Sequence, residues 1–340
     1  MKFSIPYNFD RKLIEQVVQK YLGHIHEVYL PANSNIMGSG RKRSTPPNYD
    51  EDVAEIADIL HRHRIEVNML FNAACTGTRF LRQDAINTLL NYLSVMYKEH
   101  GINSITIVDL RLATVIRDNF PDLKIIASTN AFVNSVRKAQ YWKDKGANAI
   151  CLDRDINKDI KRIRAIRENV DIEIRLLLND PCLPECPYRS MHINVEAHLS
   201  GERTNLEYMD PFHACCGAIF KDIRETRPWA LYSSPMVLPR YLHHYEALVD
   251  IFKISGRSLT TTDVLQFIDS YIYNTPYADE RYASKTGVRI GMVPDEAFTK
   301  ILNCDKACYD CHYCEDIYNS IQKELTLLNA ALMNFDFHTR

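Results

Sequence analysis

Four cysteines fall within eleven positions near the end of the sequence, in the segment NCDKACYDCHYCEDIY. Cys304, Cys308, Cys311 and Cys314 have the spacing C-x3-C-x2-C-x2-C. Structural zinc sites usually combine two C-x-x-C pairs that are well separated in sequence, whereas a bacterial ferredoxin binds its iron–sulfur cluster through a tight run of cysteines. The run therefore predicts a 4Fe–4S cluster, with zinc as the alternative. The remaining interpretation, four reduced surface thiols, would leave them open to oxidation.

A second group of cysteines lies in the middle of the chain. Cys182 and Cys186 stand in LLLNDPCLPECPYRSMHIN, Cys215 and Cys216 are adjacent in FHACCGAIF, and Cys75 stands earlier in LFNAACTGTRF. Neighbouring side chains diverge, so we expect only one of the adjacent pair to bind a metal together with the other three. This set predicts a second 4Fe–4S cluster. For Cys75 alone, a small buried hydrophobic residue is the alternative.

Histidines and cations that could transfer protons or bind substrate accompany these cysteines. His192, His198 and His213 lie in the same segment as the second cysteine group. Each could serve in proton transfer or in substrate binding, and a structural role is the alternative for each. Lys253 and Arg257 stand in and after the stretch FKISGR, and we expect Arg257 to contact substrate or a nearby carboxylate.

A short basic loop stands earlier in the chain, where residues 41–43 read RKR. Arginines can bind a carboxylate or a phosphate, although an exposed basic turn is the alternative. For peptide hydrolysis, by contrast, the sequence offers no HExxH, GxSxG or caspase-like segment. The residues themselves therefore favour metal and redox chemistry over proteolysis.

The elements that must position these residues alternate between apolar strands and amphipathic helices. Helical spacing is found at about 10–23, 51–64, 84–101 and 260–274, with a final helical pattern at 320–335. The strands are apolar nearly throughout, as in a parallel sheet that helices cover on both faces. Eight segments read as strands: KFSIPYN, HEVYLP, EVNMLFNA, 104–109, 124–129, 149–153, 173–179 and 250–255.

This order predicts an α/β protein with a (β/α)8 barrel of the TIM type, and an open doubly wound sheet is the alternative. No GxGxxG or P-loop follows a strand, which weighs against a nucleotide-binding sheet. Residues 181–249 form a long cysteine-bearing insertion between strands seven and eight, expected at the C-terminal face of the barrel. We therefore predict a barrel over 1–275 and a cysteine-rich C-terminal subdomain over 276–340.

Composition limits the class of protein. Of the 340 residues, 46% are hydrophobic and 25% are charged, and the net charge of −2 provides no global field for nucleic acid. We find neither the apolar run of a signal peptide nor the roughly 20 apolar residues that span a membrane. These features predict a cytoplasmic protein. Ten cysteines in a reducing compartment then indicate metal binding rather than disulfides.

Three segments together resemble the collagenase-like peptidase family U32: the Cys182–Cys186 stretch, HACC, and PRYLHHYEALVDIFKISGR. In that family a Tyr-Glu-x-Leu-x4-Phe-Lys-Ile-x-Gly-Arg segment forms the last strand of a barrel. The opening MKFSIPYN, the GSGR at 38–41 and the tail cysteines resemble a subgroup of anaerobic bacteria. The residues that match the last-strand segment are Tyr245, Glu246, Leu248, Phe252, Lys253, Ile254, Gly256 and Arg257.

The resemblance implies one of two activities. Some members are described as collagenases, whereas others carry a 4Fe–4S cluster on four cysteines and support oxygen-independent hydroxylation. The implied substrates are the ubiquinone ring, a tRNA uridine or an rRNA cytidine, with prephenate as oxygen donor, and some members act as heterodimers. The present chain departs from the family pattern at Ser255, where glutamate is usual, and at the Cys215–Cys216 doublet.

We therefore expect an iron–sulfur enzyme with two 4Fe–4S clusters, one at the barrel mouth and one in the tail. Its chemistry would be redox or oxygen insertion under anaerobic conditions, on a small molecule, a peptide or RNA. An electron donor or a homologous subunit is the expected partner, and no membrane is involved. The alternatives are a U32-type peptidase with a structural metal and a non-catalytic iron–sulfur subunit.

Overall fold

Eight parallel strands close into a barrel in the order β1 to β8, and β8 pairs with β1. The structure is a computed structural model that describes residues 1–41, 45–201 and 210–336, with backbone alone at 201, 210–215 and 329–336. The predicted (β/α)8 barrel is confirmed, because β1–β8 pairing rules out an open sheet. The strands are β1 (Phe3–Pro6), β2 (Ile25–Pro31), β3 (Glu66–Phe71), β4 (Ser104–Ile107), β5 (Lys124–Ala127), β6 (Ala149–Cys151), β7 (Glu173–Leu177) and β8 (Ile251–Lys253).

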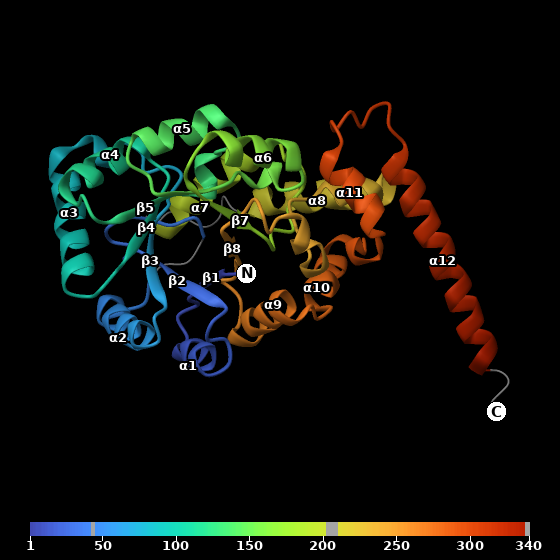
Figure 1. Cartoon of the computed structure of the whole chain (residues 1–340), viewed down its shortest axis with the longest axis horizontal. Coiled ribbons are helices and arrows are strands. Elements are labelled where there is room, and N and C mark those ends of the chain that lie inside the picture. The colour runs from blue at the N-terminus through green and yellow to red at the C-terminus, as the bar shows by residue number, and fades with distance from the viewer. Residues whose placement is uncertain (42–44, 202–209, 337–340) are drawn as a thin grey trace.

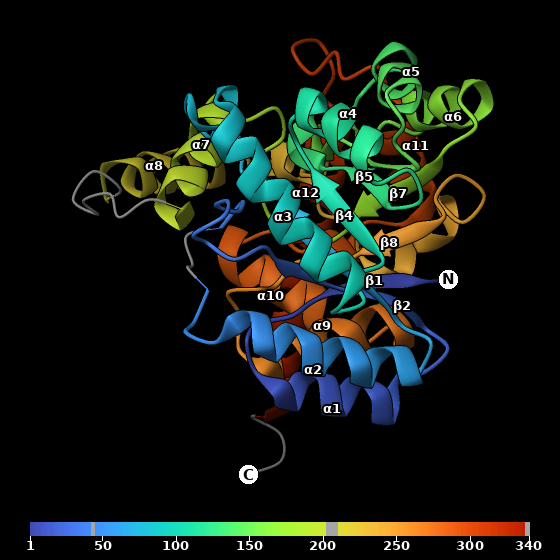
Figure 2. The same ribbon diagram turned by 90° about the vertical axis from the view of Figure 1, so that its left-hand side faces the viewer.

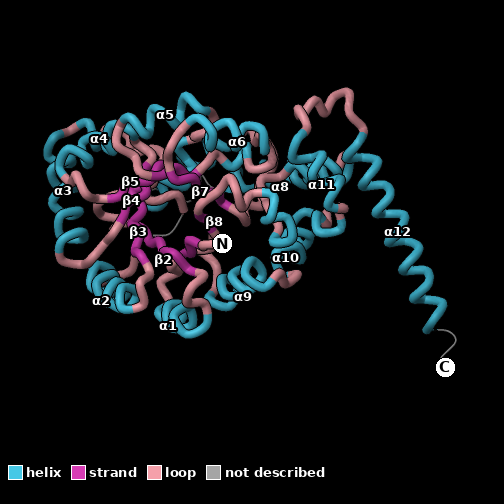
Figure 3. Tube along the Cα trace, viewed as in Figure 1, coloured by secondary structure: helices cyan, strands magenta, loops and turns pink. Residues whose placement is uncertain are grey.

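Helices surround the barrel as an outer ring (Figures 1 and 3). In α1, Asp10 caps the N-terminus by accepting a hydrogen bond from the Lys12 amide, and Leu13, Ile14 and Val17 are buried. All helices of the ring bury one face against the barrel in this way. They are α1 (Arg11–Lys20), α2 (Tyr49–Arg62), α3 (Gln83–Lys98), α4 (Leu110–Asn119), α5 (Val136–Asp144), α6 (Ile160–Asn169) and α9 (Thr261–Tyr273), with short 3₁₀ turns η1 (Arg79–Leu81), η2 (Thr129–Ala131) and η3 (Arg154–Ile156).

In its described residues, the insertion between β7 and β8 forms two helices and two 3₁₀ turns. These are α7 (Arg189–Gly201), α8 (Asp210–Thr226), η5 (Pro228–Ser233) and η6 (Pro239–His244). Figure 2 shows α7 and α8 on the side of the barrel that faces away from the N-terminus. That side is where the strands end, so the insertion covers the C-terminal face, as expected for an element of the site.

The segment after α9 forms α10 (Tyr277–Thr286), η7 (Ile290–Met292), α11 (Asp295–Asn303) and α12 (Tyr313–Asp336). Tyr318 of α12 packs against Trp229 and Tyr232 of η5, so the tail contacts the insertion. The far part of α12 extends away from the body of the protein (Figure 1).

The division of the chain into a barrel over 1–275 and a subdomain over 276–340 stays a prediction. Among the helices of the described ranges, none has the length and apolarity that crossing a membrane requires.

A buried ion pair joins opposite parts of the barrel interior. An Arg175 nitrogen on β7 lies 2.6 Å from Oε1 of Glu27 on β2, and the two side chains are 1% and 0% exposed. Ser4 donates a second hydrogen bond to the same oxygen, and Glu173 accepts one from Arg175 Nε. Burial has the largest single effect on the pKa of Glu27 and would raise it, but the Arg175 guanidinium, with help from Lys253 and Ser4, lowers this pKa overall. Glu27 is therefore ionised inside the barrel.

We predict that Arg175→Met lowers the free energy of unfolding by about 3–5 kcal/mol, because the Glu27 carboxylate loses its buried counter-charge. The measurement is urea denaturation at neutral pH. Arg62→Met is the matched control, since Arg62 pairs with Asp58 on an exposed helix face and such pairs contribute about 0–1 kcal/mol. Equal losses in both variants would contradict the prediction.

The same ion pair predicts acid sensitivity. Because the folded-state pKa of Glu27 is lowered, its stabilisation is complete above the ordinary value of 4.5 and is lost as the pH falls below it. Wild-type protein should therefore lose stability between neutral pH and pH 3 more steeply than Glu27→Gln. Parallel curves for the two proteins would show that Glu27 titrates normally.

Candidate functional site at the barrel mouth

A small cavity of about 60 Å³ opens where the strands end, and four cations stand among the neutral residues of its walls. Arg41 follows β2, Arg154 begins η3 after β6, Lys253 ends β8, and Arg257 follows β8. Among the described residues that line it, none carries a carboxylate. The mouth is therefore suited to an anionic ligand.

The loop that carries Arg41 is fixed from two sides. Ser200 of α7 accepts a hydrogen bond from the Ser39 amide at 2.6 Å and donates one to the Ser39 carbonyl at 2.8 Å. The Gly40 amide donates to the side-chain oxygen of Asn72, just after β3. The insertion helix thus holds the loop over the mouth. Lys42 and Arg43, the other cations predicted in this loop, lie outside the described residues.

Lys253 has its ammonium 3.8 Å from the centroid of the Tyr29 ring. Exclusion of water lowers the pKa of Lys253 to about 8, although the nearby Cys151 and Glu27 oppose this shift. An amine that titrates this close to neutral pH can both accept and donate a proton. Lys253 is thus the mouth residue best suited to acid–base work.

The other cations of the mouth are held in place. Arg154 donates to Asp180 at 2.5 Å and to Asn130 at 2.7 Å. Arg257 is buried, and burial together with the Arg41 charge lowers its pKa to about 10. Arg154 and Asp180 escaped the sequence analysis. Both residues follow closely after β6 and β7, and residues at the C-terminal ends of barrel strands commonly form the site, so this position could have indicated them.

A larger cavity of about 280 Å³ adjoins the mouth and contains three predicted cysteine ligands: Cys182, Cys186 and Cys216. Arg41 and Arg154 line both cavities, so the thiols lie beside the cationic mouth. These cysteines come from the loop after β7 and from α8. The long insertion therefore folds back to bring distant thiols together.

Hydrogen bonds fix the loop that carries Cys182 and Cys186. Arg189 donates to Asp155 at 2.7 Å and to the Leu183 carbonyl at 2.8 Å, and the Glu185 amide also donates to Asp155. Burial and the Asp180 charge raise the pKa of Cys182 to about 11, and burial raises that of Cys216. Such thiols stay protonated in neutral solution unless a metal ion replaces the proton.

Helix α7 separates the remaining candidates. His192 lines the cavity of the three cysteines, with its Nε2 3.7 Å from Glu196. Cys75 and His198 line a different cavity of about 30 Å³. The structure therefore does not bring Cys75 to the other thiols, and its role as a ligand stays a prediction. The side chains of His213 and Cys215 lie outside the described residues.

The tail cysteines form their own group between α11 and the start of α12. Lys306 donates to Sγ of Cys304 at 3.2 Å and to the Lys158 carbonyl at 2.9 Å. Burial and then the three other tail cysteines raise the pKa of Cys314 to about 11. All four thiols therefore lie close enough to interact electrostatically. Cys308 and Cys311 are exposed.

An electrostatic effect links the loop of the first cysteine group to the tail. Burial raises the pKa of the Cys308 thiol, and Glu185 is among the charges that add to this effect. Glu185 directly precedes Cys186, whose side chain lines the cavity at the mouth. More than a hundred residues separate Glu185 from Cys308 in the sequence, and only the fold brings the Glu185 charge within reach of that thiol.

Comparisons with known proteins agree with this architecture. The sequence profile of peptidase family U32 matches residues 12–290, so the chain belongs to this family, as its motifs indicated. A solved structure described as the U32 peptidase Mk0906 superposes with a TM-score of 0.56 at 19% identity, covering 75% of this chain and 93% of that one. That similarity supports the fold.

Two groups of curated relatives carry different names. MJ1657 of Methanocaldococcus jannaschii, named an uncharacterized protease, is 28% identical over 91% of this chain and 90% of its own. The tRNA hydroxylation protein P2 of Bacillus subtilis is 29% identical over 37% of this chain and 38% of its own. The 23S rRNA 5-hydroxycytidine C2501 synthase of Escherichia coli is 24% identical over 40% and 19%. The match to the hydroxylation proteins is thus a partial one.

We predict that Lys253 titrates near pH 8 in the folded protein, because the mouth excludes water from its ammonium. In protein carrying 13C-labelled lysine, one side-chain resonance should titrate there and vanish in Lys253→Met. The exposed control Lys20→Met should leave this resonance in place. A second resonance, from buried Lys158, should titrate near pH 7 and persist in both variants. Titration of Lys253 near the ordinary 10.5 would contradict a water-excluding mouth.

Proposed function

We propose that this protein is an iron–sulfur enzyme that inserts oxygen into a base of tRNA or rRNA without using molecular oxygen. The observation that carries the proposal is the cavity in which Cys182, Cys186 and Cys216 converge, next to a mouth lined by cations. The names of two relatives, a tRNA hydroxylation protein and an rRNA hydroxycytidine synthase, support the type of reaction. An RNA substrate would place the protein in the cytoplasm.

The donor set fits an iron–sulfur cluster. Thiolates bind such clusters, and the cations Arg41, Arg154, Arg189 and Lys285 around the cavity would offset their negative charge. Cys182, Cys186 and Cys216 would hold one cluster, and Cys75, the fourth ligand of the predicted set, lines a separate cavity on the other side of α7. When bound, this cluster supplies one-electron chemistry.

For the tail we favour a second cluster over a zinc ion, because its four cysteines stand in one tight run of the kind that binds clusters in ferredoxins. We propose that Cys304, Cys308, Cys311 and Cys314 hold a cluster that exchanges electrons with the site at the mouth, since the charge of Glu185, the residue before Cys186, acts on the Cys308 thiol.

The residues of the mouth have distinct tasks in this proposal. Arg41, Arg154 and Arg257 bind the anionic oxygen donor, for which the dicarboxylate prephenate is the candidate that the family resemblance implies. Lys253 moves a proton at the reacting centre, because its pKa lies near neutral. Helices α7 and α8 cover the site and limit the access of water.

Two alternatives remain open. A peptidase is supported by the name of the Methanocaldococcus relative, and in that case the metal would be structural. Against it, burial raises the pKa of Cys151, the cysteine of the mouth, which disfavours the nucleophilic thiolate. A non-catalytic subunit would need a homologous partner before any activity is seen.

We predict about eight irons and eight sulfides per chain in protein purified without oxygen, as two cubane clusters require. Cys182→Ser/Cys186→Ser should lose about half of the iron, and Cys308→Ser/Cys311→Ser the other half. Cys151→Ser, which alters a buried cysteine outside both groups, is the control and should keep all of it. One zinc per chain without iron would overturn the proposal.

We predict that RNA from cells lacking this protein contains one nucleoside that is lighter by a single oxygen atom. Mass spectrometry of digested tRNA and rRNA would detect it, and the wild-type gene should restore the heavier form. Lys253→Met should lower the rate of restoration roughly 100-fold or more, as for a lost proton-transfer group, whereas Lys20→Met should restore fully. Unchanged RNA, together with collagen-peptide cleavage that survives cluster oxidation, would establish the peptidase instead.

A further inference from the structure

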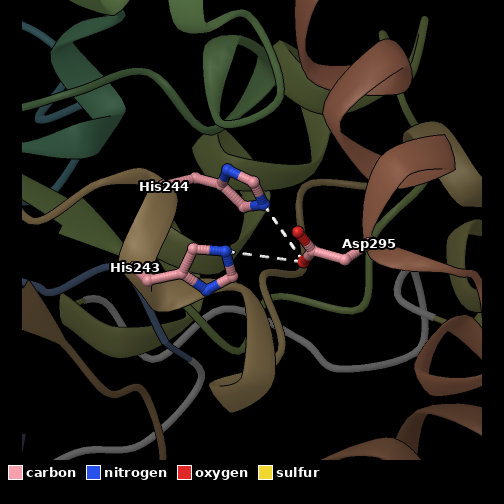
Figure 4. A group of neighbouring side chains, drawn as sticks. All are labelled: His243, His244 and Asp295. Carbon is pink, nitrogen blue, oxygen red and sulfur yellow. Dashed lines mark hydrogen bonds and ion pairs between the residues drawn. The ribbon is translucent and has the colours of Figure 1, made fainter.

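Two adjacent histidines and an aspartate form a three-residue group away from the barrel mouth. His243 and His244 end η6, before β8, and Asp295 begins α11 in the tail. Nε2 of His243 lies 3.5 Å from Oδ1 of Asp295, and Nε2 of His244 lies 3.3 Å from the same atom. Figure 4 shows both rings directed at this carboxylate.

The spacing of these three atoms suits a metal site, and it also suits the hydrogen bond that His244 Nε2 can make to Asp295 Oδ1. A charge-assisted N–H···O bond is about 2.7–2.9 Å long, which is shorter than both contacts. Ligand atoms around a tetrahedral ion with bonds of about 2.1 Å are about 3.4 Å apart. The observed 3.3 and 3.5 Å agree with that edge length, and all three ligand atoms lie within 4.8 Å of one another.

A backbone contact presents His243 as a ligand. Its Nδ1 lies 3.0 Å from the Arg240 carbonyl, which can only accept, so Nδ1 donates the proton. In the neutral ring, Nε2 then carries a lone pair that faces Asp295 Oδ1, another acceptor. Either a proton on Nε2 or a bound cation between the two atoms removes this conflict. Metal-binding histidines are commonly oriented in this way, by a carbonyl on the second nitrogen.

Independent contacts hold the two sides of the group together. The Tyr241 ring stacks on Phe298 of α11, with centroids 3.6 Å apart and planes at 9°. The Tyr241 hydroxyl can donate to the carbonyls of Ile290 and Val293, at 3.0 and 2.6 Å. These contacts fix η6 against α11 without any contribution from the histidines. The ligands are thus positioned in advance, which lowers the cost of binding.

We propose that His243, His244 and Asp295 bind a divalent transition-metal ion of the zinc class, with water completing a tetrahedral shell. The histidines and Asp295 are 53%, 16% and 48% exposed, so solvent can reach the ion. Imidazole nitrogen and carboxylate oxygen are donors that Zn²⁺ accepts. The ion joins the insertion to the helix whose C-terminal end leads directly into Cys304. It therefore clamps the base of the tail cysteine group, whatever that group holds.

The test is zinc stoichiometry in the full-length protein, by equilibrium dialysis over a series of buffered free zinc concentrations. Cysteines contribute equally in all variants, so differences report on this group alone. His243→Ala/His244→Ala and Asp295→Asn should each bind one zinc fewer per chain than wild type. His61→Ala/His63→Ala, with two histidines near the end of α2, is the matched control and should bind as much as wild type.

Thermal unfolding gives a second readout that does not depend on stoichiometry. Zinc should raise the midpoint of wild type and of the His61→Ala/His63→Ala control more than those of the two site variants, because an ion that binds only the folded state stabilises it. Equal zinc content and equal shifts in all four proteins would overturn the proposal. So would loss of one zinc in the control. Neither result would affect the proposed oxygen-insertion chemistry, which rests on other residues.

Discussion

The buried pair of Glu27 and Arg175 sets the arrangement of the barrel interior. Side chains alternate between the inside and the outside of a strand, so an inward residue requires that the residue two positions later also points inward. Glu27 therefore places Tyr29 at the mouth, and Arg175 places Leu177 there. A shift of either strand by one residue would leave a charge among the apolar contacts between barrel and helices. The free-energy cost of burying an unpaired charge keeps both strands in register. The residues of the mouth that these strands carry are therefore fixed as well.

Arginines at the C-terminal end of the barrel connect the mouth with the cysteine cavity. Arg41 and Arg154 line both cavities, and Asp180 holds Arg154 while Asp155 holds Arg189. Carboxylates near the site thus serve to orient cations. The cations favour an anionic ligand, and Arg154 and Arg189 partly oppose the burial that raises the pKa of Cys182. The gathering of cations at one place also explains how a chain with a net charge of −2 can present a cationic site.

The insertion and the tail depend on each other. Tyr318 packs on Trp229 and Tyr232, and Tyr241 stacks on Phe298, so aromatic contacts join the two segments. The charge of Glu185, in the loop of Cys182 and Cys186, also acts on the Cys308 thiol. A metal ion on the two histidines of η6 would strengthen the same interface at its edge. The cysteine-rich tail is thus placed by the insertion, which in turn covers the barrel mouth.

The sequence by itself determined the barrel, because the spacing of apolar residues within each segment is enough to indicate a strand or an amphipathic helix. It also determined the tail cysteine group, whose thiols are neighbours in the chain. Only the tertiary structure decided which distant groups meet. It placed Cys182, Cys186 and Cys216 on one cavity and Cys75 on another, because α7 runs between them. It likewise joined His243 and His244 to Asp295, since side chains from separate elements meet only through packing, which no local pattern records.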